Sequence, residues 1–326
     1  MNKAVKQNIN RRDFINRSSM LPLLAGVSLG VGFGLDSSPT VAAEPVQRVG
    51  GPKLKISLNA YSFSKPLNDH IKGRGKGMTL MDLLDFCAEH NFDAVDPTGY
   101  FFPGYPNVPT DKYINEFKRR AHQLGLDISG TGVRNDFAQV DKQKRAADVQ
   151  HVKEWCEVSA KLGAPVLRVF AGLPPAGHDW SEAAKWMSDD LRQCAEFGEE
   201  YGVLIGVQNH GDMLKTAEDT IKIVEMVDSN WFGVIVDTGY FQTEDPYVDI
   251  AKVMPYAVNF QVKESPFGKD STVRTDLGRL VTIVRDAGYR GYLPIETLSI
   301  PHRPYNPKEL VPQFLAELQT ALGKTA

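Results

Sequence analysis

Four stretches of the sequence end an apolar run with a polar side chain that can bind a cation or a hydroxyl group. Each run is short and rich in Val, Ile and Leu, as in a buried strand of a parallel sheet. Chemistry in closed parallel barrels gathers at the carboxyl ends of the strands, so we expect the four side chains to meet. They are Gln208, Asp237, Gln261 and Glu296.

These four side chains offer two carboxylates and two amide oxygens. An all-oxygen set suits hard divalent cations such as Mg²⁺, Mn²⁺ or Ca²⁺ better than Zn²⁺. The same residues also predict a pocket in which amides and carboxylates bind sugar hydroxyl groups without an ion. His210 lies two residues past Gln208, on the same face of an extended strand, and could bind an ion or move protons. The residues alone leave both interpretations open.

Short apolar strands alternate with amphipathic helices, which predicts an α/β fold that is a single (β/α)₈ TIM barrel. Gly125, Gly163, Gly202 and Gly288 each stand between a helix and the next strand, at the left-handed position that closes a helix. An open doubly wound sheet is the alternative, but no Gly-x-Gly-x-x-Gly follows the first strand. Expected strands cover 54–59, 92–95, 127–133 and 165–170, and four more end at 208, 237, 264 and 296. Expected helices cover 79–90, 111–124, 141–162, 181–201, 216–227 and 307–322, with weaker patterns near 247–254 and 275–287 and a long loop before residue 79.

The first 43 residues have the features of a twin-arginine signal peptide. Arg11 and Arg12 precede an apolar, Gly-containing segment at 20–35, and 41–43 reads Val-Ala-Ala. A membrane anchor would need about 20 apolar residues without helix-weakening glycine. We therefore expect export by the twin-arginine machinery to the periplasm or beyond, removal of 1–43, and one barrel domain at 44–326 with no membrane association.

The composition is that of an ordinary globular chain, with 42% hydrophobic and 24% charged residues. The net charge of −3 does not suit a nucleic-acid partner. The three cysteines, Cys87, Cys156 and Cys194, all fall in helix-like stretches, and their odd number predicts buried thiols without a disulfide. The sequence leaves the oligomeric state open.

Five segments, taken in order, resemble the xylose isomerase-like barrel superfamily and, within it, the sugar phosphate isomerase/epimerase family. They are Asn-Ala-Tyr-Ser-Phe at 59–63, Gln-Asn-His-Gly at 208–211, Asp-Thr-Gly at 237–239, Val-Lys-Glu at 262–264 and Pro-Ile-Glu-Thr at 294–297. The resemblance implies a xylose isomerase-like TIM barrel and a divalent ion, usually Mn²⁺ or a relative, held by Glu, Asp, His and Glu. Asp237 and Glu296 match that set, whereas Gln208 replaces the first Glu and Gln261 replaces the His.

The resemblance further implies that the two Glu residues of the family move a proton on and off the carbon beside a carbonyl. An amide cannot take up a proton, so Gln208 argues against this symmetric mechanism. We expect a one-base mechanism with Glu296 as the base and His210, Lys263 or Glu264 as the other group. The predicted cofactor is Mn²⁺ or Mg²⁺ on Gln208, Asp237, Gln261 and Glu296, bound more weakly than by the usual set because two neutral amides are present.

The predicted partner is a small carbohydrate substrate without phosphate, because sugar phosphates are cytoplasmic and the sequence shows no Gly-rich phosphate cradle. The leading expectation is an exported sugar isomerase or epimerase that acts on a keto-sugar. The alternatives are a lyase or hydrolase of 3-keto-glycosides that uses the same site, and a carbohydrate-binding barrel without catalysis. Residues expected to contact the substrate are Asn59, Tyr61, Asp96, Arg134, Arg168, Glu264 and His302.

Overall fold

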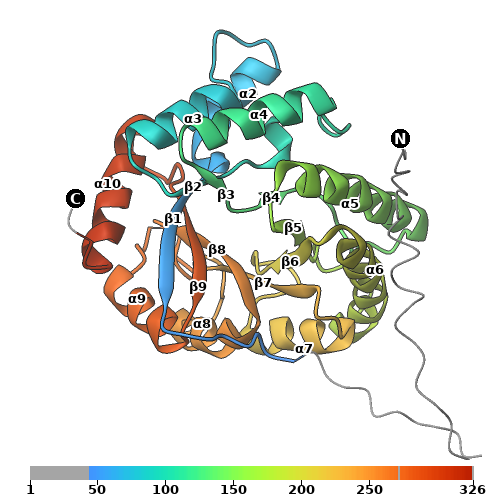
Figure 1. The fold of residues 1–326 in the computed structure, drawn as a ribbon. Helices are drawn as coiled ribbons and strands as arrows, with labels where there is room; N and C mark the ends of the chain where they lie inside the picture. The colour runs from blue at the N-terminus through green and yellow to red at the C-terminus, as the bar shows by residue number, and fades with distance from the viewer. Residues whose placement is uncertain (1–43, 271, 325–326) are drawn as a thin grey trace, which may run out of the picture. The chain divides into compact units, whose positions relative to one another are not determined.

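Parallel strands form the centre of the structure, and the helices that connect them form an outer ring (Figure 1). The computed structural model describes residues 44–270 and 272–324, so the predicted signal peptide lies outside the described residues. No helix in the described part of the chain has the length and apolarity needed to cross a bilayer. In the order β3-β2-β1-β9-β8-β7-β6-β5-β4, neighbouring strands pair in parallel. The strands are β1 (Lys53–Asn59), β2 (Ala94–Asp96), β3 (Asp127–Ile128), β4 (Thr131–Gly132), β5 (Val166–Phe170), β6 (Leu204–Gln208), β7 (Phe232–Asp237), β8 (Ala257–Lys263) and β9 (Arg290–Glu296).

The predicted barrel is confirmed, with one correction to its third strand. The stretch expected as one strand at 127–133 forms two pieces, because β3 pairs with β2 whereas β4 pairs with β5. Between them lies Gly130, where a Cβ atom would lie 3.0 Å from Asn259 Nδ2 and 3.2 Å from Asp96 Oδ2. The chain therefore passes close to buried polar groups at this point, and only a residue without a side chain fits without displacing them.

The helices begin and end close to where the sequence places them. The expected glycines at 125, 163, 202 and 288 all have positive φ angles. One helix was missed: α2 lies in the expected long loop, and it buries only Leu67, so its apolar pattern is too weak to detect.

The three cysteines are buried in α3, α5 and α6 and form no disulfide, as predicted. The helices are α2 (Ser64–Ile71), α3 (Leu80–Glu89), α4 (Asp111–Gln123), α5 (Lys142–Leu162), α6 (Trp180–Tyr201), α7 (Ala217–Val227), α8 (Pro246–Val253), α9 (Leu277–Asp286) and α10 (Pro307–Ala321), with 3₁₀ turns η1 (Ala60–Phe63), η2 (Gly99–Phe101) and η3 (Met254–Tyr256).

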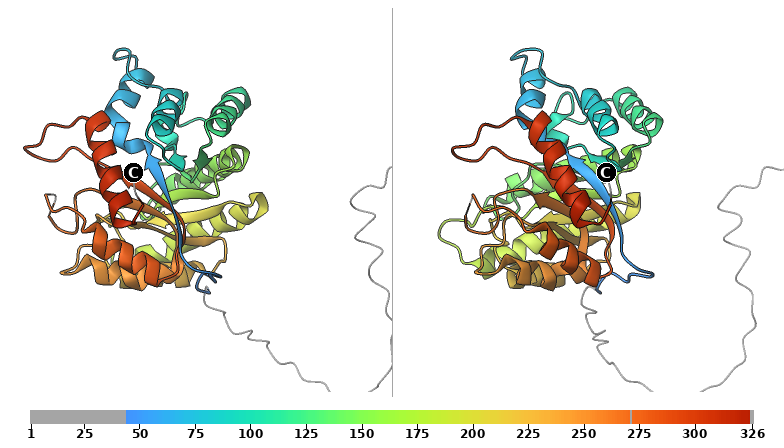
Figure 2. Two further views of the ribbon diagram at one scale, coloured as in Figure 1. Left: turned by 60° about the vertical axis from the view of Figure 1, so that its left-hand side comes forward. Right: turned by 90° about the vertical axis from the view of Figure 1, so that its left-hand side faces the viewer.

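The segment before β1 runs along the amino ends of the strands. Val46 donates its backbone N–H to Pro255 O at 2.8 Å, and Arg48 Nη2 donates to Ala257 O at 2.9 Å. Figure 2 shows this segment in blue, leading into β1. The amino ends of the strands are therefore partly covered, while the carboxyl ends carry the polar side chains.

The interior of the barrel is unusually polar for a fold whose interior is generally filled with aliphatic side chains. Ser57 Oγ and Ser129 Oγ lie 2.7 Å apart, and Asn259 Nδ2 donates to Ser129 O at 3.1 Å. Asp96 lies in the same region, and its Oδ1 accepts from Asn59 Nδ2 at 3.4 Å. Burial raises the pKa of Asp96 to about 7, although the nearby Arg168 guanidinium acts in the opposite direction.

This shift predicts a pH dependence of stability. The pKa of Asp96 is near 3.8 when unfolded and about 7 when folded, so between these values the folded state holds a proton that the unfolded state has lost. The free energy of unfolding should therefore fall as the pH rises through this window. Over this pH window the free energy of unfolding of the Asp96→Asn variant, which cannot ionise at this position, should fall by about 2–4 kcal/mol less than that of the wild type. Urea unfolding below and above the window measures the difference, and parallel pH profiles for the two proteins would contradict the assignment.

Candidate active site

A cavity of about 450 Å³ lies at the carboxyl ends of the strands. Its polar lining comes from strands on every side of the barrel, as expected when strand ends converge. The lining residues are Asn59, Tyr61, Thr98, Tyr100, Arg134, Asn135, Asp136, Arg168, Phe170, Gly172, Leu173, Gln208, His210, Asp212, Tyr240, Gln261, Lys263, Glu296 and Leu298.

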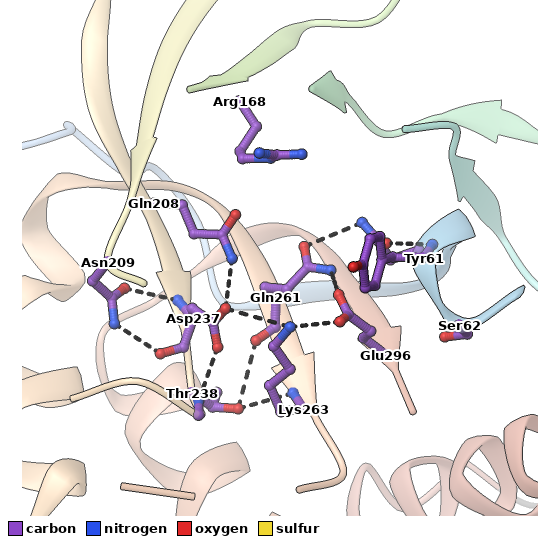
Figure 3. Close-up of polar contacts among 12 residues, drawn as sticks. Tyr61, Ser62, Arg168, Gln208, Asn209, Asp237, Thr238, Gln261, Lys263 and Glu296 are labelled. Atoms are coloured by element: carbon purple, nitrogen blue, oxygen red, sulfur yellow. Dashed lines mark hydrogen bonds and ion pairs between the residues drawn. The ribbon is translucent and has the colours of Figure 1, made fainter. Parts of the chain in front are cut away.

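Lys263, at the end of β8, lies between two carboxylates (Figure 3). Its Nζ atom lies 2.6 Å from Glu296 Oε1 and 3.6 Å from Asp237 Oδ2. All three side chains are buried, with exposed fractions of 2% for Lys263, 3% for Glu296 and 0% for Asp237. The carboxyl ends of β7, β8 and β9 thus form one buried cluster of charges.

The two glutamines add hydrogen bonds to the same carboxylates. Gln208 Nε2 donates to Asp237 Oδ2 at 2.5 Å, and Gln261 Nε2 donates to Glu296 Oε2. The oxygen of Gln261 accepts from Asn59 Nδ2 at 3.3 Å. Because an ionised carboxylate can only accept, each amide must present its NH₂ group to it. The four predicted side chains therefore do converge, through direct bonds between amides and carboxylates.

Neighbouring residues fix the position of Asp237. Asn209 exchanges two hydrogen bonds of 2.9 Å with the Asp237 backbone, and Gly239 N donates to Asp237 Oδ1 at 2.9 Å. Thr238 Oγ1 accepts from Lys263 N at 2.9 Å. These positioning roles of Asn209 and Thr238 were not predicted, because they join strands whose register only the folded barrel sets.

The electrostatics of the cluster follow from burial opposed by pairing. Burial raises the pKa of Asp237 to about 6, while the Lys263 ammonium acts to lower it and Glu296 to raise it further. For Lys263 burial alone would lower the pKa, but the Asp237 and Glu296 carboxylates together raise it above its usual value. The lysine therefore stays protonated, and the cavity has a fixed positive charge beside a carboxylate.

His210 lies in the cavity wall between two aromatic rings. Its ring centroid is 4.9 Å from that of Phe170 and 4.2 Å from that of Tyr240. Burial, followed by the positive charges of Lys263 and Arg168, lowers its pKa to about 3. His210 is thus a neutral imidazole that can donate one hydrogen bond and accept another.

Arg168, Arg134 and Tyr100 also line the cavity, and Figure 3 shows Arg168 above Gln208. Arg168 donates from Nη1 to Val133 O at 3.1 Å and from Nη2 to the Tyr100 hydroxyl at 2.7 Å. Its guanidinium lies 4.2 Å from the Phe170 ring centroid, and the Arg134 guanidinium lies 4.7 Å from that of Tyr100. These contacts use only part of the donor capacity of Arg168, which leaves N–H groups for a bound oxygen.

Three residues expected to contact the substrate are not among those that line the cavity. Glu264 follows Lys263 and points to the other face of the strand, where it accepts from Arg303 at 2.6 and 2.9 Å. His302 is exposed in the loop after β9, with a φ angle of 63°. Asp96 is buried behind Asn59 rather than in the cavity lining. Asn135 and Asp136, by contrast, line the cavity although they were not among the predicted site residues. Their position just after the third strand could have identified them from the sequence, because the carboxyl ends of the strands form the site.

The donor set does not fit the divalent ion that the resemblance implies. A hard cation needs several oxygens directed at one point, preferably anionic ones. Here both amides direct NH₂ groups at the carboxylates, and an ammonium already lies between them. Among residues 44–270 and 272–324, no three His, Cys, Asp or Glu side chains are placed to hold a metal. The Mn²⁺ or Mg²⁺ cofactor stays a prediction from the resemblance.

Comparison with known proteins relates the chain to enzymes of sugar chemistry. An inosose dehydratase of Lactiplantibacillus plantarum is 24% identical over 195 residues, 55% of this chain and 59% of the relative, so less than two thirds of that relative is matched. The 3-keto-D-glucoside 4-epimerase of E. coli has a TM-score of 0.64 and 15% identity, over 82% of this chain and 99% of that one. The D-psicose 3-epimerase of Clostridium cellulolyticum H10 has a TM-score of 0.64 and 17% identity, over 82% and 97%. Structural likeness at such identities shows a shared fold.

A sequence model of one family covers most of the barrel. The model is described as the xylose isomerase-like TIM barrel, and it matches residues 84–318. This match includes part of α3, all of α4 to α9, most of α10 and all strands except β1, and therefore every strand that contributes to the charge cluster. The chain belongs to the xylose isomerase-like TIM barrel family.

Proposed function

We propose that the protein is an enzyme that removes a proton from the carbon beside a carbonyl group in a polyhydroxylated substrate without phosphate. One observation carries the proposal: Glu296 lines the cavity as a carboxylate with the Lys263 ammonium 2.6 Å away. A proton acceptor and a fixed positive charge thus stand side by side. This pair supplies what removal of a proton beside a carbonyl requires.

In the proposed step, Glu296 takes the proton as the C–H bond breaks. The electron pair of that bond forms a carbon–carbon double bond, and the carbonyl oxygen becomes an enolate oxygen. The buried Lys263 ammonium stabilises the developing negative charge. Glu296 retains lone pairs for the proton, although Lys263 and Gln261 donate to its two oxygens.

The names of the similar proteins support this type of step. Epimerisation at carbon 4 of a 3-keto-glucoside and at carbon 3 of psicose both change the carbon next to a ketone. An inosose dehydratase likewise acts, by its name, on a polyhydroxylated ketone, and removal of a proton beside that ketone is compatible with loss of water. A cavity of about 450 Å³ is of the size that holds a small ligand such as a monosaccharide or short glycoside.

Two outcomes can follow the enolate: epimerisation and elimination. Epimerisation needs a second group that returns the proton to the opposite face of the carbon. The amide of Gln208 cannot do so, and His210 is a neutral imidazole whose pKa is lowered to about 3, which makes it a poor proton donor, so epimerisation needs another donor from the cavity lining. Elimination needs one base and a donor to the leaving oxygen, so the lyase alternative is the second candidate. Export of the enzyme stays a prediction from residues 1–43.

Incubation in D₂O with D-psicose, a 3-keto-D-glucoside and an inosose tests the proposal. We expect the wild type to place deuterium beside the carbonyl of at least one of them, or to release water or the aglycone. Glu296→Gln should reduce this rate by ~10²–10³-fold, because the amide cannot accept the proton. Proton NMR and chromatography measure exchange, epimer and elimination product.

The matched control is Asp249→Asn, which alters a buried carboxylate outside the cavity. Asp249 Oδ1 accepts from Ala217 N at 2.7 Å, a bond that an asparagine oxygen preserves. This variant should keep wild-type turnover. Equal exchange by wild type and Glu296→Gln would contradict the role of Glu296. Sugar binding without exchange or release would favour the non-catalytic alternative.

Arg168 is expected to position the substrate rather than to react. Replacing it by Met removes the N–H groups that face the cavity and should raise KM roughly tenfold or more, with a smaller change in kcat. Arg168→Lys should recover only part of the affinity, because an ammonium lacks the planar set of donors. Steady-state kinetics separate the two parameters. A loss confined to kcat would place Arg168 in the chemical step instead.

A further inference from the structure

The charge cluster at the base of the cavity raises the question of what balances its two carboxylates. Asp237 and Glu296 are buried, and neither pairs with an arginine within 4.0 Å among the described residues. Two buried carboxylates on adjacent parts of one site repel each other unless a cation lies between them. Lys263 Nζ is that cation, at 2.6 Å from one and 3.6 Å from the other.

We propose that the Lys263 ammonium permanently occupies the place of a divalent cation in this barrel, so that the protein works as a metal-independent member of its family. Only the statement that the reaction needs no metal rests on the proposed function. The structural part concerns which cation the carboxylates hold, and it can be tested without turnover.

Contacts with neighbouring residues hold Lys263 in place. Its backbone N–H donates to Thr238 Oγ1 at 2.9 Å, and its carbonyl oxygen accepts from Thr275 Oγ1 at 2.7 Å. The ammonium also lies 5.3 Å from the centroid of the Tyr240 ring, a distance at which the ring face attracts a cation. Neighbouring groups on two sides thus hold the backbone and head group of this lysine.

The two glutamines fit an ammonium and not a metal. A carboxylate in the place of Gln208 would lie against Asp237 Oδ2, where Gln208 now donates at 2.5 Å, and would repel it unless a divalent ion joined them. Gln261 likewise donates to Glu296 Oε2. Two neutral amides and one ammonium leave the cluster with one net negative charge, whereas the Glu, Asp, His and Glu set implied by the resemblance carries three negative charges and needs a divalent ion to reach the same net charge.

The replacement also preserves the chemistry that a cation provides. An ammonium beside the substrate oxygen can stabilise an enolate by charge and by hydrogen bonding. The reaction of the wild type should then be independent of chelators and of the supply of metal ions.

Thermal unfolding of the full chain with and without Mn²⁺ tests the inference, together with metal content after dialysis. The wild type should retain no stoichiometric metal, and Mn²⁺ should leave its melting temperature unchanged. Lys263→Met leaves two buried carboxylates without their cation, so its melting temperature should fall by roughly 5–10 °C. Added Mn²⁺ should restore part of that loss by binding the folded state.

Arg303→Met is the matched control, because it also removes a cation from a buried carboxylate, Glu264, outside the cavity. Mn²⁺ should not restore its stability to a comparable extent. A second pair keeps the test decisive if Lys263→Met does not fold. The triple variant Gln208→Glu, Gln261→His, Lys263→Met should bind Mn²⁺ at least ~10-fold more tightly than the double variant that retains Lys263.

Two results would overturn the inference. One is a wild type that holds about one equivalent of divalent metal after dialysis or gains stability with Mn²⁺ as the Lys263→Met variant does. The other is equal Mn²⁺ affinity in the double and triple variants. Neither result depends on a substrate, so this test can be carried out even if no turnover is found. A metal-bound wild type would overturn this inference but would not contradict the role of Glu296, which the Glu296→Gln variant tests separately.

Discussion

The buried contact between the Lys263 ammonium and the carboxylates of Asp237 and Glu296 is the interaction on which the site depends. Removing three charges from water costs several kcal/mol for each ion, and only close pairing and full hydrogen bonding offset that cost. Gln208 and Gln261 supply the additional donors. Removing Lys263 would leave both carboxylates uncompensated, so the three charges have to be explained as a unit.

The barrel provides the geometry that makes this cluster possible. Parallel strands direct their carboxyl ends to one rim, so residues from β6, β7, β8 and β9 that are far apart in sequence meet there. Asn209 and Thr238 then lock β6 to β7 and β7 to β8 at the height of the charges. The polar interior below, with Ser57, Ser129 and Asn259, lets buried polar groups near Asp96 find partners where an aliphatic core would offer none.

A shared fold does not by itself determine a shared site. Structural neighbours at 15% and 17% identity have the same barrel, yet the residues at the rim determine the chemistry. In this chain the carboxylate of Glu296 lines the cavity beside a fixed cation, while Gln208 is the amide at the position where the sequence resemblance implies a second Glu. That asymmetry distinguishes the proposed one-base reaction from a symmetric exchange between two carboxylates.

Strand and helix patterns are local, and they therefore determined the barrel, its helix-ending glycines and the four strand-end residues that converge. The alternation of side chains along a strand places Lys263 with Gln261 and turns Glu264 to the other face, so the expectation that Glu264 contacts the substrate was wrong. Other features depend on contacts between distant segments: the break at Gly130, the burial of Asp96, and the displacement of His302 into an exposed loop. Only the tertiary structure decided that the amides face the carboxylates and that an ammonium lies between them, because side-chain direction and burial are set by strands that meet only after folding.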